Sequence, residues 1–276
     1  MNPNGPSPIS LTSMLRSIVG HRGLIMQMTY RDVVGRYRGS VMGLLWSFLN
    51  PLFMLVVYTF VFSVVFKARW AGSEPQSHGE FAIILFSGMI VHSLFAEVLN
   101  KAPSLIITNV NYVKKVVFPL EILPIISLGG ALFHTLISIV VLLLAAWLIT
   151  GTLYWTIILV PLVYMPLIVL TLGLAWILAS LGVYLRDINQ TIGIITTVML
   201  FLSPVFFPVS ALPENYRPLM QFNPLTFIIE QARAVLVWGQ LPDFQGLVLY
   251  SLIALLVAWV GYAWFQKTRR GFADVL

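Results

Sequence analysis

The sequence predicts an all-α integral membrane protein with six transmembrane helices. Of its 276 residues, 59% are hydrophobic and only 9% are charged, which is too little charge for the surface of a soluble protein. The apolar residues gather in stretches close to the roughly 20 residues that an α-helix needs to cross a bilayer. The Lys and Arg residues lie mainly in alternate connections between these stretches.

The six spans are assigned from apolar stretches, because backbone groups in hydrocarbon must form hydrogen bonds within their own helix. The clearest boundary is the short polar segment 151–156 between the third and fourth stretches. The whole chain, 1–276, is treated as one transmembrane domain. The predicted spans are residues 41–66, 81–100, 123–149, 157–185, 191–207 and 247–265.

The basic residues predict the orientation of the helices. Twelve of the 16 Lys and Arg residues lie in the N-terminal segment, in the connections after the second and fourth spans, and at the C-terminus. Lys and Arg concentrate on the cytoplasmic side of membrane proteins. Both termini are therefore expected in the cytoplasm, which agrees with an even number of spans.

The segment before the first span is neither a loop nor a span. Residues 9–30 mix apolar side chains with Arg16, His21 and Arg22. This pattern predicts an amphipathic helix in the cytoplasmic membrane interface. The alternative is a basic segment that only sets topology.

A proline-rich segment precedes the last span on the predicted outer side. Its apolar part, Leu225–Gly239, is too short to cross a bilayer. Asn223 can cap a helix there, and Pro224 can occupy its first position. A short re-entrant helix that dips into the outer leaflet, or one that caps the bundle, is therefore expected.

Two charged residues inside this segment, Glu230 and Arg233, are three positions apart, so they would share a helix face and can pair.

Few residues could carry chemistry. The sequence has no Cys, no G-x-x-x-x-G-K-[ST] stretch and no H-E-x-x-H motif. No catalytic residue, cofactor site or metal site is therefore expected in this chain, and no basic patch with aromatic residues suggests nucleic acid. A membrane glycosyl- or phosphotransferase would need paired carboxylates, and Asp32, Glu121 and Asp187 form no such motif.

Three ionisable residues fall within predicted spans: His92, Glu97 and His134. Such residues are candidates for function in a membrane, although a histidine can also serve packing through one hydrogen bond. Glu97 lies four residues before Lys101, which predicts a pair within one helix. One Glu and one His make a poor proton relay, so any energy for transport is expected from a partner.

Small residues recur every four positions where the first span begins, at Gly35, Gly39, Gly43 and Ser47. This spacing predicts a face for close helix packing. Flexible glycines at a helix start are the alternative.

Aromatic residues at the far end of the same span, Tyr58, Phe62 and Phe66, share a face if they are helical. Aromatic faces can stack on the apolar side of a sugar ring. Contact with lipid or with the core is the alternative. The candidate path residues are Trp46, Tyr58, Phe62, Phe66, Phe201 and Phe206.

The loop after the second span, NYVKKVVFPLEILP, mixes basic residues with apolar and aromatic ones. Apolar anchors with a charged rim are typical of a docking surface. The alternative is that these apolar residues lie in the membrane interface.

Several segments together resemble a known family. They are RYRGSVMGLLWSFLNPL, the NYVKKVVFPLEILP loop, YLRDI, and SPVFFP followed by NPLTFIIEQAR. The set resembles the membrane subunits of ABC-2-type polysaccharide exporters, and it is most similar to O-antigen (lipopolysaccharide) export permeases. The resemblance extends from about residue 9 to the C-terminus and keeps the order of the segments.

The resemblance implies a homodimer in the bacterial inner membrane, bound to two copies of a separate ATPase. That partner would bind ATP and Mg, and the dimer would extrude a lipid-linked polysaccharide. Residues 109–123 would contain the coupling helix, and spans one and five would line the path. Residues 213–239 would form the outer, extracytoplasmic gate helices, and the implied gate residues are Pro204, Pro208, Glu230 and Arg233. The implied coupling residues are Tyr112, Lys114, Lys115, Phe118 and Glu121.

Two alternatives remain open within similar folds. The cargo could be a capsular polysaccharide or a teichoic acid. An ABC-2 exporter of drugs or small lipids would depend less on the aromatic residues.

Overall fold

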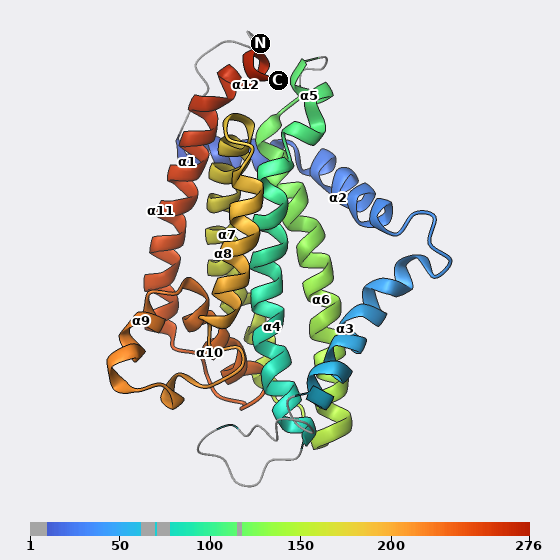
Figure 1. Ribbon diagram of the computed structural model, residues 1–276, viewed down its shortest axis with the longest axis vertical. Helices are drawn as coiled ribbons and strands as arrows, with labels where there is room; N and C mark the ends of the chain where they lie inside the picture. Colours follow the sequence, from blue (N-terminus) through green and yellow to red (C-terminus); the bar gives the residue numbers. More distant parts are fainter. Residues whose placement is uncertain (1–9, 62–69, 71–77, 115–117) are drawn as a thin grey trace.

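The computed structural model describes residues 10–61, 70, 78–114 and 118–276. Every regular element in these ranges is helical (Figure 1), which confirms the predicted all-α class. The described ranges contain five helices that are long and apolar enough to cross a membrane: Gly43–Val61, Gly79–Ser104, Leu120–Thr150, Trp155–Tyr184 and Phe244–Val275.

Five predicted spans correspond to long helices. Their main α-helical parts are α3 (Trp46–Tyr58), α4 (His78–Lys101), α6 (Leu123–Thr150), α7 (Val160–Tyr184) and α11 (Phe244–Thr268). The first span begins near its predicted start, and its predicted end at residue 66 lies outside the described residues.

The helix in the fifth predicted span is shorter than expected. The prediction covered residues 191–207, whereas α8 (Ile188–Phe201) has 14 residues. The chain leaves the helix at Leu202 and reaches Pro204, which can neither donate a backbone hydrogen bond nor continue the helix without distortion. At 1.5 Å per residue, a helix of this length falls short of the hydrocarbon core.

The predicted interface helix over 9–30 is two helices, α1 (Leu11–Gly20) and α2 (Arg22–Arg36). The Ser10 side chain caps α1 by accepting from the backbone nitrogen of Ser13. The helices separate at His21, whose Nδ1 lies 2.8 Å from the carbonyl oxygen of Ser17. The His21 side chain therefore forms a hydrogen bond with one of the last backbone carbonyls of α1, and the chain turns at this residue.

The remaining helices lie at the two ends of the bundle (Figure 1). Near the termini are α5 (Val110–Lys114) and α12 (Phe272–Val275), which contact each other. At the opposite end are α9 (Arg217–Gln221) and α10 (Pro224–Leu236). The Asn223 side chain accepts from the backbone nitrogen of Leu225, as expected for the cap of α10.

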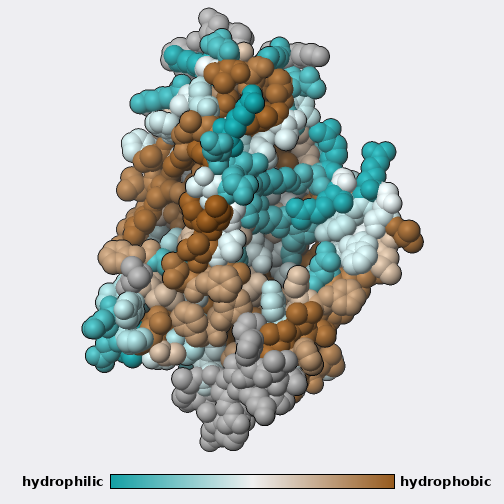
Figure 2. Space-filling model, in the orientation of Figure 1, coloured by the Kyte–Doolittle hydropathy of each residue, from teal (hydrophilic) through white to brown (hydrophobic). Residues whose placement is uncertain are grey.

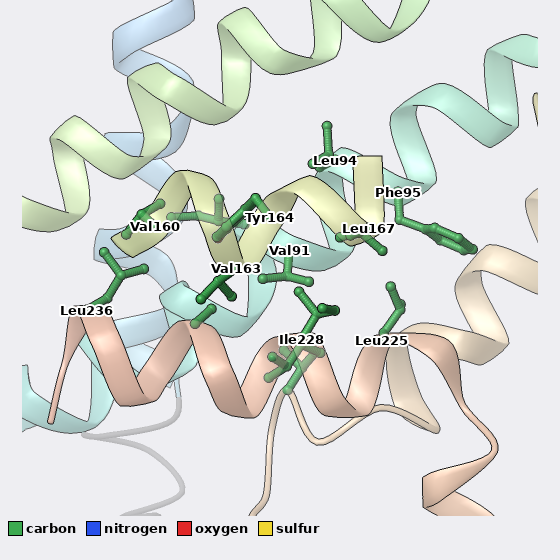
Figure 3. Packing of buried hydrophobic residues seen from close by; sticks show 14 of the residues in the cluster. Val91, Leu94, Phe95, Val160, Val163, Tyr164, Leu167, Leu225, Ile228 and Leu236 are labelled. Atoms are coloured by element: carbon green, nitrogen blue, oxygen red, sulfur yellow. The ribbon is translucent and has the colours of Figure 1, made fainter. Parts of the chain in front are cut away.

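The core forms where α7 meets α4 and α10. Figure 3 shows Val163 and Leu167 of α7 facing Val91 of α4 and Ile228 of α10. All four side chains are buried. This packing attaches the short helix α10 firmly to the membrane-spanning bundle.

Backbones of α7 and α11 approach closely at two glycines. A Cβ atom on Gly173 would lie 2.7 Å from the Cα atom of Ala258, and one on Gly261 would lie 2.1 Å from the carbonyl oxygen of Gly173. Small residues allow such contacts between membrane helices.

The predicted packing face at the start of the first span does not occur within this chain. Gly35, Gly39 and Gly43 have open space where a Cβ atom would lie. They do not share a helix, because α2 ends at Arg36. Gly39 and Gly43 instead turn the chain with φ angles of 86° and 50°, which glycine adopts at low cost. Ser47 is buried and donates to the carbonyl of Leu44.

Candidate functional site

Two ion pairs join the interface helix α2 to the membrane helix α4. Lys101 Nζ lies 2.7 Å from Asp32 Oδ2, and Arg36 Nη2 lies 2.7 Å from Glu97 Oε1. On each helix the two charged residues are four positions apart, so they share a face. We call this arrangement the charge ladder. The predicted pair between Glu97 and Lys101 is absent, because each residue binds α2 instead.

A histidine on a third helix completes the charge ladder. His134 of α6 places Nδ1 3.0 Å from Glu97 Oε1 and Nε2 3.1 Å from the Tyr37 hydroxyl. Nδ1 is shared between Glu97, which can only accept, and Arg36 Nη1 at 3.1 Å, which can only donate, while Nε2 forms a hydrogen bond with the Tyr37 hydroxyl. His134 therefore links α2, α4 and α6. The His92 ring, in contrast, forms its one hydrogen bond among the described residues with the carbonyl oxygen of Thr196, at 2.9 Å, as a packing histidine would.

A polar cavity of 530 Å³ lies beside the charge ladder, between α2 and the ends of α4 and α6. Its lining includes Arg31, Asp32, Arg36 and Lys101. The buried hydroxyl of Ser127 also lines it and has no hydrogen-bond partner. Figure 2 shows hydrophilic residues extending from the end with the termini into the middle of this face, between two apolar regions. A polar group can thus approach the bundle at the level of α2.

The predicted docking loop contains the short helix α5. Tyr112 stacks on Phe118 with ring centroids 4.4 Å apart, and its hydroxyl accepts from Arg31 Nη2 at 2.9 Å. Lys114 is exposed at the end of α5. Lys115 lies outside the described residues. The loop is therefore connected to α2 while presenting a basic side chain to solvent.

Glu121 occupies a different environment from the other predicted coupling residues. It is only 8% exposed, and its carboxylate accepts from Ser17 Oγ and Arg269 Nη1, each at 3.0 Å. Its carbonyl oxygen accepts from the indole of Trp176 at 2.9 Å. Glu121 thus ties α1, α7 and the end of α11 together, and it is not available for direct contact with a partner.

The predicted path residues separate into groups. Phe201 and Phe206 stack with centroids 5.7 Å apart. Tyr58 and Phe206 pack against the same buried cluster, which includes Phe81 and Leu85. Tyr58 also lines a 230 Å³ cavity between α3, α4 and α6.

Trp46 is half-buried at the opposite end of α3, so the structure does not place it with these aromatic residues. Phe62 and Phe66 lie outside the described residues.

Arg233 of α10 is the most enclosed charged residue of the predicted gate, at 1% exposure. Its guanidinium donates to the carbonyl oxygens of Ile84, Pro204 and Val205 at 3.1, 2.6 and 2.9 Å. It also lies 4.3 Å from the centre of the Trp70 ring. Burial lowers the pKa of the Arg233 guanidinium to about 9, so the group stays charged at neutral pH.

The predicted pair between Glu230 and Arg233 does not form in the part of the chain that the structure describes. Arg233 turns instead toward carbonyls that the chain leaves free where α8 ends. Gly88 makes room for it, because a Cβ atom there would lie 2.8 Å from Arg233 Nη2. Pro204 is buried beside Arg233, and Pro208 precedes the next helical turn. Burial raises the pKa of the Glu230 carboxyl.

The charge ladder was not predicted, although its members were visible in the sequence. Asp32 and Arg36 have the same spacing and the same order of signs as Glu97 and Lys101, so the charges match when the two helices run antiparallel. This complementarity between two segments was the available signal. The complementary charges indicate a contact only once α2 is known to lie against α4.

The family comparison identifies the class of protein. The model of the ABC-2 type transporter family matches residues 23–237, from α2 to the end of α10. This chain belongs to the ABC-2 type transporter family. Membrane subunits of this family are transport components and not ATPases.

Three curated relatives match nearly the whole chain. The O-antigen export system permease protein RfbA of Myxococcus xanthus is 28% identical over 263 residues, covering 95% of this chain and 98% of the relative. Two proteins of the same name from Klebsiella pneumoniae are 24% and 25% identical, each covering 92% of this chain and 95% of the relative.

Proposed function

We propose that this chain is the permease subunit of an ATP-driven exporter that moves lipid-linked polysaccharide of the O-antigen type across the bacterial inner membrane. The observation that carries the proposal is the match over at least 92% of the chain to three relatives named as O-antigen export permeases. The polar cavity beside α2 supports it, because the polar head of a lipid-linked polymer can reach the bundle there.

The proposed topology has six spans with both termini in the cytoplasm. Its support is that α1 and α12, the first and last described helices, lie at the same end of the bundle (Figure 1), as an even number of crossings requires. The short helix α8 then supplies the fifth crossing together with the segment that follows it. The basic residues near the termini agree with this orientation.

The proposed assembly is a homodimer bound to two copies of a cytoplasmic ATPase that holds ATP and Mg. Little of the first span is buried within the chain, and α8 exposes Ile194, Val198 and Phe201. A second copy would cover these faces and place a path between the two subunits. The exposed Lys114 and the stacked pair Tyr112–Phe118 would meet the ATPase.

The experiment is deletion of the gene in its native host, with the wild-type gene on a plasmid as the control. We expect lipid-linked polymer to accumulate inside the cell and to disappear from the surface. Chemical analysis of the accumulated material distinguishes O-antigen from capsular polysaccharide or teichoic acid. Normal surface polymer in the deletion strain would refute the proposal, and restored display from the plasmid would exclude effects on neighbouring genes.

A further inference from the structure

A second cavity, of 460 Å³, lies at the end of the bundle opposite the termini. Its walls are α10, the connection from α10 to α11, and the turn at Val209 and Ser210. This volume falls in the range of roughly 300–1,000 Å³ that is typical of ligand pockets. In the proposed topology the cavity opens on the outer side, away from the charge ladder.

Hydrogen bonds hold the walls of this cavity in place. Gly239 turns the connection with a φ of 66°, and the backbone nitrogen of Gln240 donates to the carbonyl of Ala234 at 2.8 Å. The backbone nitrogen of Asp243 donates to Gln231 Oε1 at 2.7 Å. The cavity is therefore preformed and does not depend on a flexible loop.

Polar side chains in the cavity retain hydrogen-bonding capacity. Glu230 is half-buried and has no hydrogen bond or ion pair within the described ranges. Gln231 uses its oxygen for Asp243, which leaves its two N–H donors for another group. Asp243 caps α11 through Oδ1, and its second carboxylate oxygen, Oδ2, can accept a hydrogen bond from a ligand. A carboxylate and an amide thus lie side by side on α10, as acceptor and donor.

The cavity also has an aromatic surface. Trp238 is 38% exposed and lines the cavity beside Glu230 and Gln231. Trp70 is 8% exposed and lies against Arg233. The more accessible Trp238 indole can therefore offer apolar surface to a ligand, whereas Trp70 helps to hold the wall.

This combination selects one class of ligand. A saccharide carries hydroxyl groups that donate and accept hydrogen bonds, and its rings have apolar faces that stack on aromatic groups. An anion fits poorly, because Glu230 and Asp243 repel it and Arg233 already donates to three carbonyls. A metal ion fits poorly, because no group of three His, Cys, Asp or Glu residues suited to a metal occurs among the described residues.

We propose that this cavity binds a short segment of saccharide, with Trp238 stacking on a sugar ring and Glu230 and Gln231 binding its hydroxyl groups. The inference rests on the proposed function, because polymer must reach the outer side for the cavity to be filled. The site would hold the emerging chain at each subunit, beside the path between the two copies.

The test is saccharide binding to the complete exporter, purified with its ATPase in nanodiscs. The probe is the host's own surface polysaccharide, released from lipid with mild acid and cut to oligosaccharides. Calorimetry is expected to detect binding that Trp238→Ala weakens by about fivefold, since an aromatic contact contributes on the order of 1 kcal/mol. Glu230→Ala is expected to weaken binding as well.

The matched control is Trp155→Ala, which removes an indole that is 69% exposed and precedes α7 at the same end of the bundle. It is expected to leave binding unchanged. The thermal unfolding midpoint of each purified variant separates loss of binding from loss of fold. Glu230→Gln, which keeps the shape of the side chain, provides a second variant if Trp238→Ala does not fold.

The outcomes separate this inference from the proposed function. Absence of binding to the wild-type exporter, or equal binding by the Trp238→Ala and Trp155→Ala variants, overturns the saccharide site. If the deletion strain still accumulates polymer, the proposed function stands without the site. If that strain displays polymer normally, the proposed function falls and the assigned ligand class falls with it.

Discussion

Arg36 of α2 lies 2.7 Å from Glu97 of α4, and Glu97 also faces His134 of α6. The interface helix is thereby attached to two membrane helices through one carboxylate. Together with Asp32 and Lys101, this contact fixes the register of α2 against α4. Movement of α2 along α4 would break both ion pairs at once.

Reversal of one charge in the ladder is expected to destabilise the protein, and reversal of both is expected to restore part of the loss. Arg36→Glu places two carboxylates together beside His134, at a cost of roughly 1–3 kcal/mol for the disrupted charged hydrogen bonds. The double variant Arg36→Glu with Glu97→Arg restores opposite charges. A double-mutant cycle on thermal unfolding of the purified protein gives the coupling.

The control for this cycle is Arg38→Glu, since Arg38 is exposed and its side chain has no hydrogen bond or ion pair in the described ranges. It is expected to change stability little. Additive effects of the two ladder substitutions would contradict a direct contact between Arg36 and Glu97.

Substitution of Gly261 is expected to separate α7 from α11. A Cβ atom there would meet the carbonyl oxygen of Gly173 at 2.1 Å, and its three nearest neighbours are all backbone atoms of Gly173, which cannot rotate away. Gly261→Ala should therefore cost on the order of 1–3 kcal/mol through overpacking. The unfolding midpoint in detergent measures the loss.

Gly23→Ala is the matched control, because Gly23 lies within α2 and has no heavy atom within 4 Å of a built Cβ. Alanine favours a helix more than glycine does, so this variant should be neutral or slightly more stable. Equal stability of the Gly261 and Gly23 variants would show that the backbones of α7 and α11 are further apart.

The stability of the empty protein is expected to depend on pH through Glu230. Burial raises the pKa of this carboxyl above its ordinary value, so the folded state binds the proton more tightly than the unfolded state. Its contribution to stability is present at low pH and is lost as the pH rises through the folded pKa. Glu230→Gln should therefore raise the unfolding midpoint at pH 7 and have little effect well below pH 4.5.

Asp243→Asn serves as a comparison, because Asp243 is exposed and caps α11. Removal of the Asp243 carboxylate should not raise the unfolding midpoint at pH 7 as the Glu230→Gln substitution does. A Glu230→Gln variant that is less stable than wild type at pH 7 would mean that the carboxylate has a partner in the folded protein.

The helices that cross the membrane were predictable because their length follows from the bilayer. The span predicted over 123–149 differs by one residue from α6, where no proline interrupts the apolar run. The prediction over 191–207 was wrong in length, since its apolar residues continue past the end of α8. Apolar composition alone does not show where a proline ends a helix.

Contacts between helices were less predictable because spacing within one helix suggests partners that tertiary structure overrides. Glu97 was assigned to Lys101, and Glu230 to Arg233, each from a spacing that brings two side chains to one face. In the structure Glu97 pairs with Arg36, and Arg233 donates to two carbonyls that follow the end of α8 and to one in α4. The sequence shows which charged residues are present, but it does not show that α2 packs against α4.

Binding of the ATPase to α5 is expected to weaken when the charge of Lys114 and the aromatic ring of Phe118 are removed together. Lys114 is exposed at the end of α5, and Phe118 holds Tyr112 through a stacked contact at 4.4 Å. An ATPase that binds this surface would lose a favourable charge and an ordered aromatic pair. Because residues central to an interface each contribute more than about 1 kcal/mol, Lys114→Glu with Phe118→Ala should reduce recovery of the ATPase on the tagged permease by more than about fivefold. Asn111→Ala, at an exposed position of the same helix, should leave recovery unchanged. If the double variant retains both the complex and stimulated ATP turnover, α5 is not the docking helix.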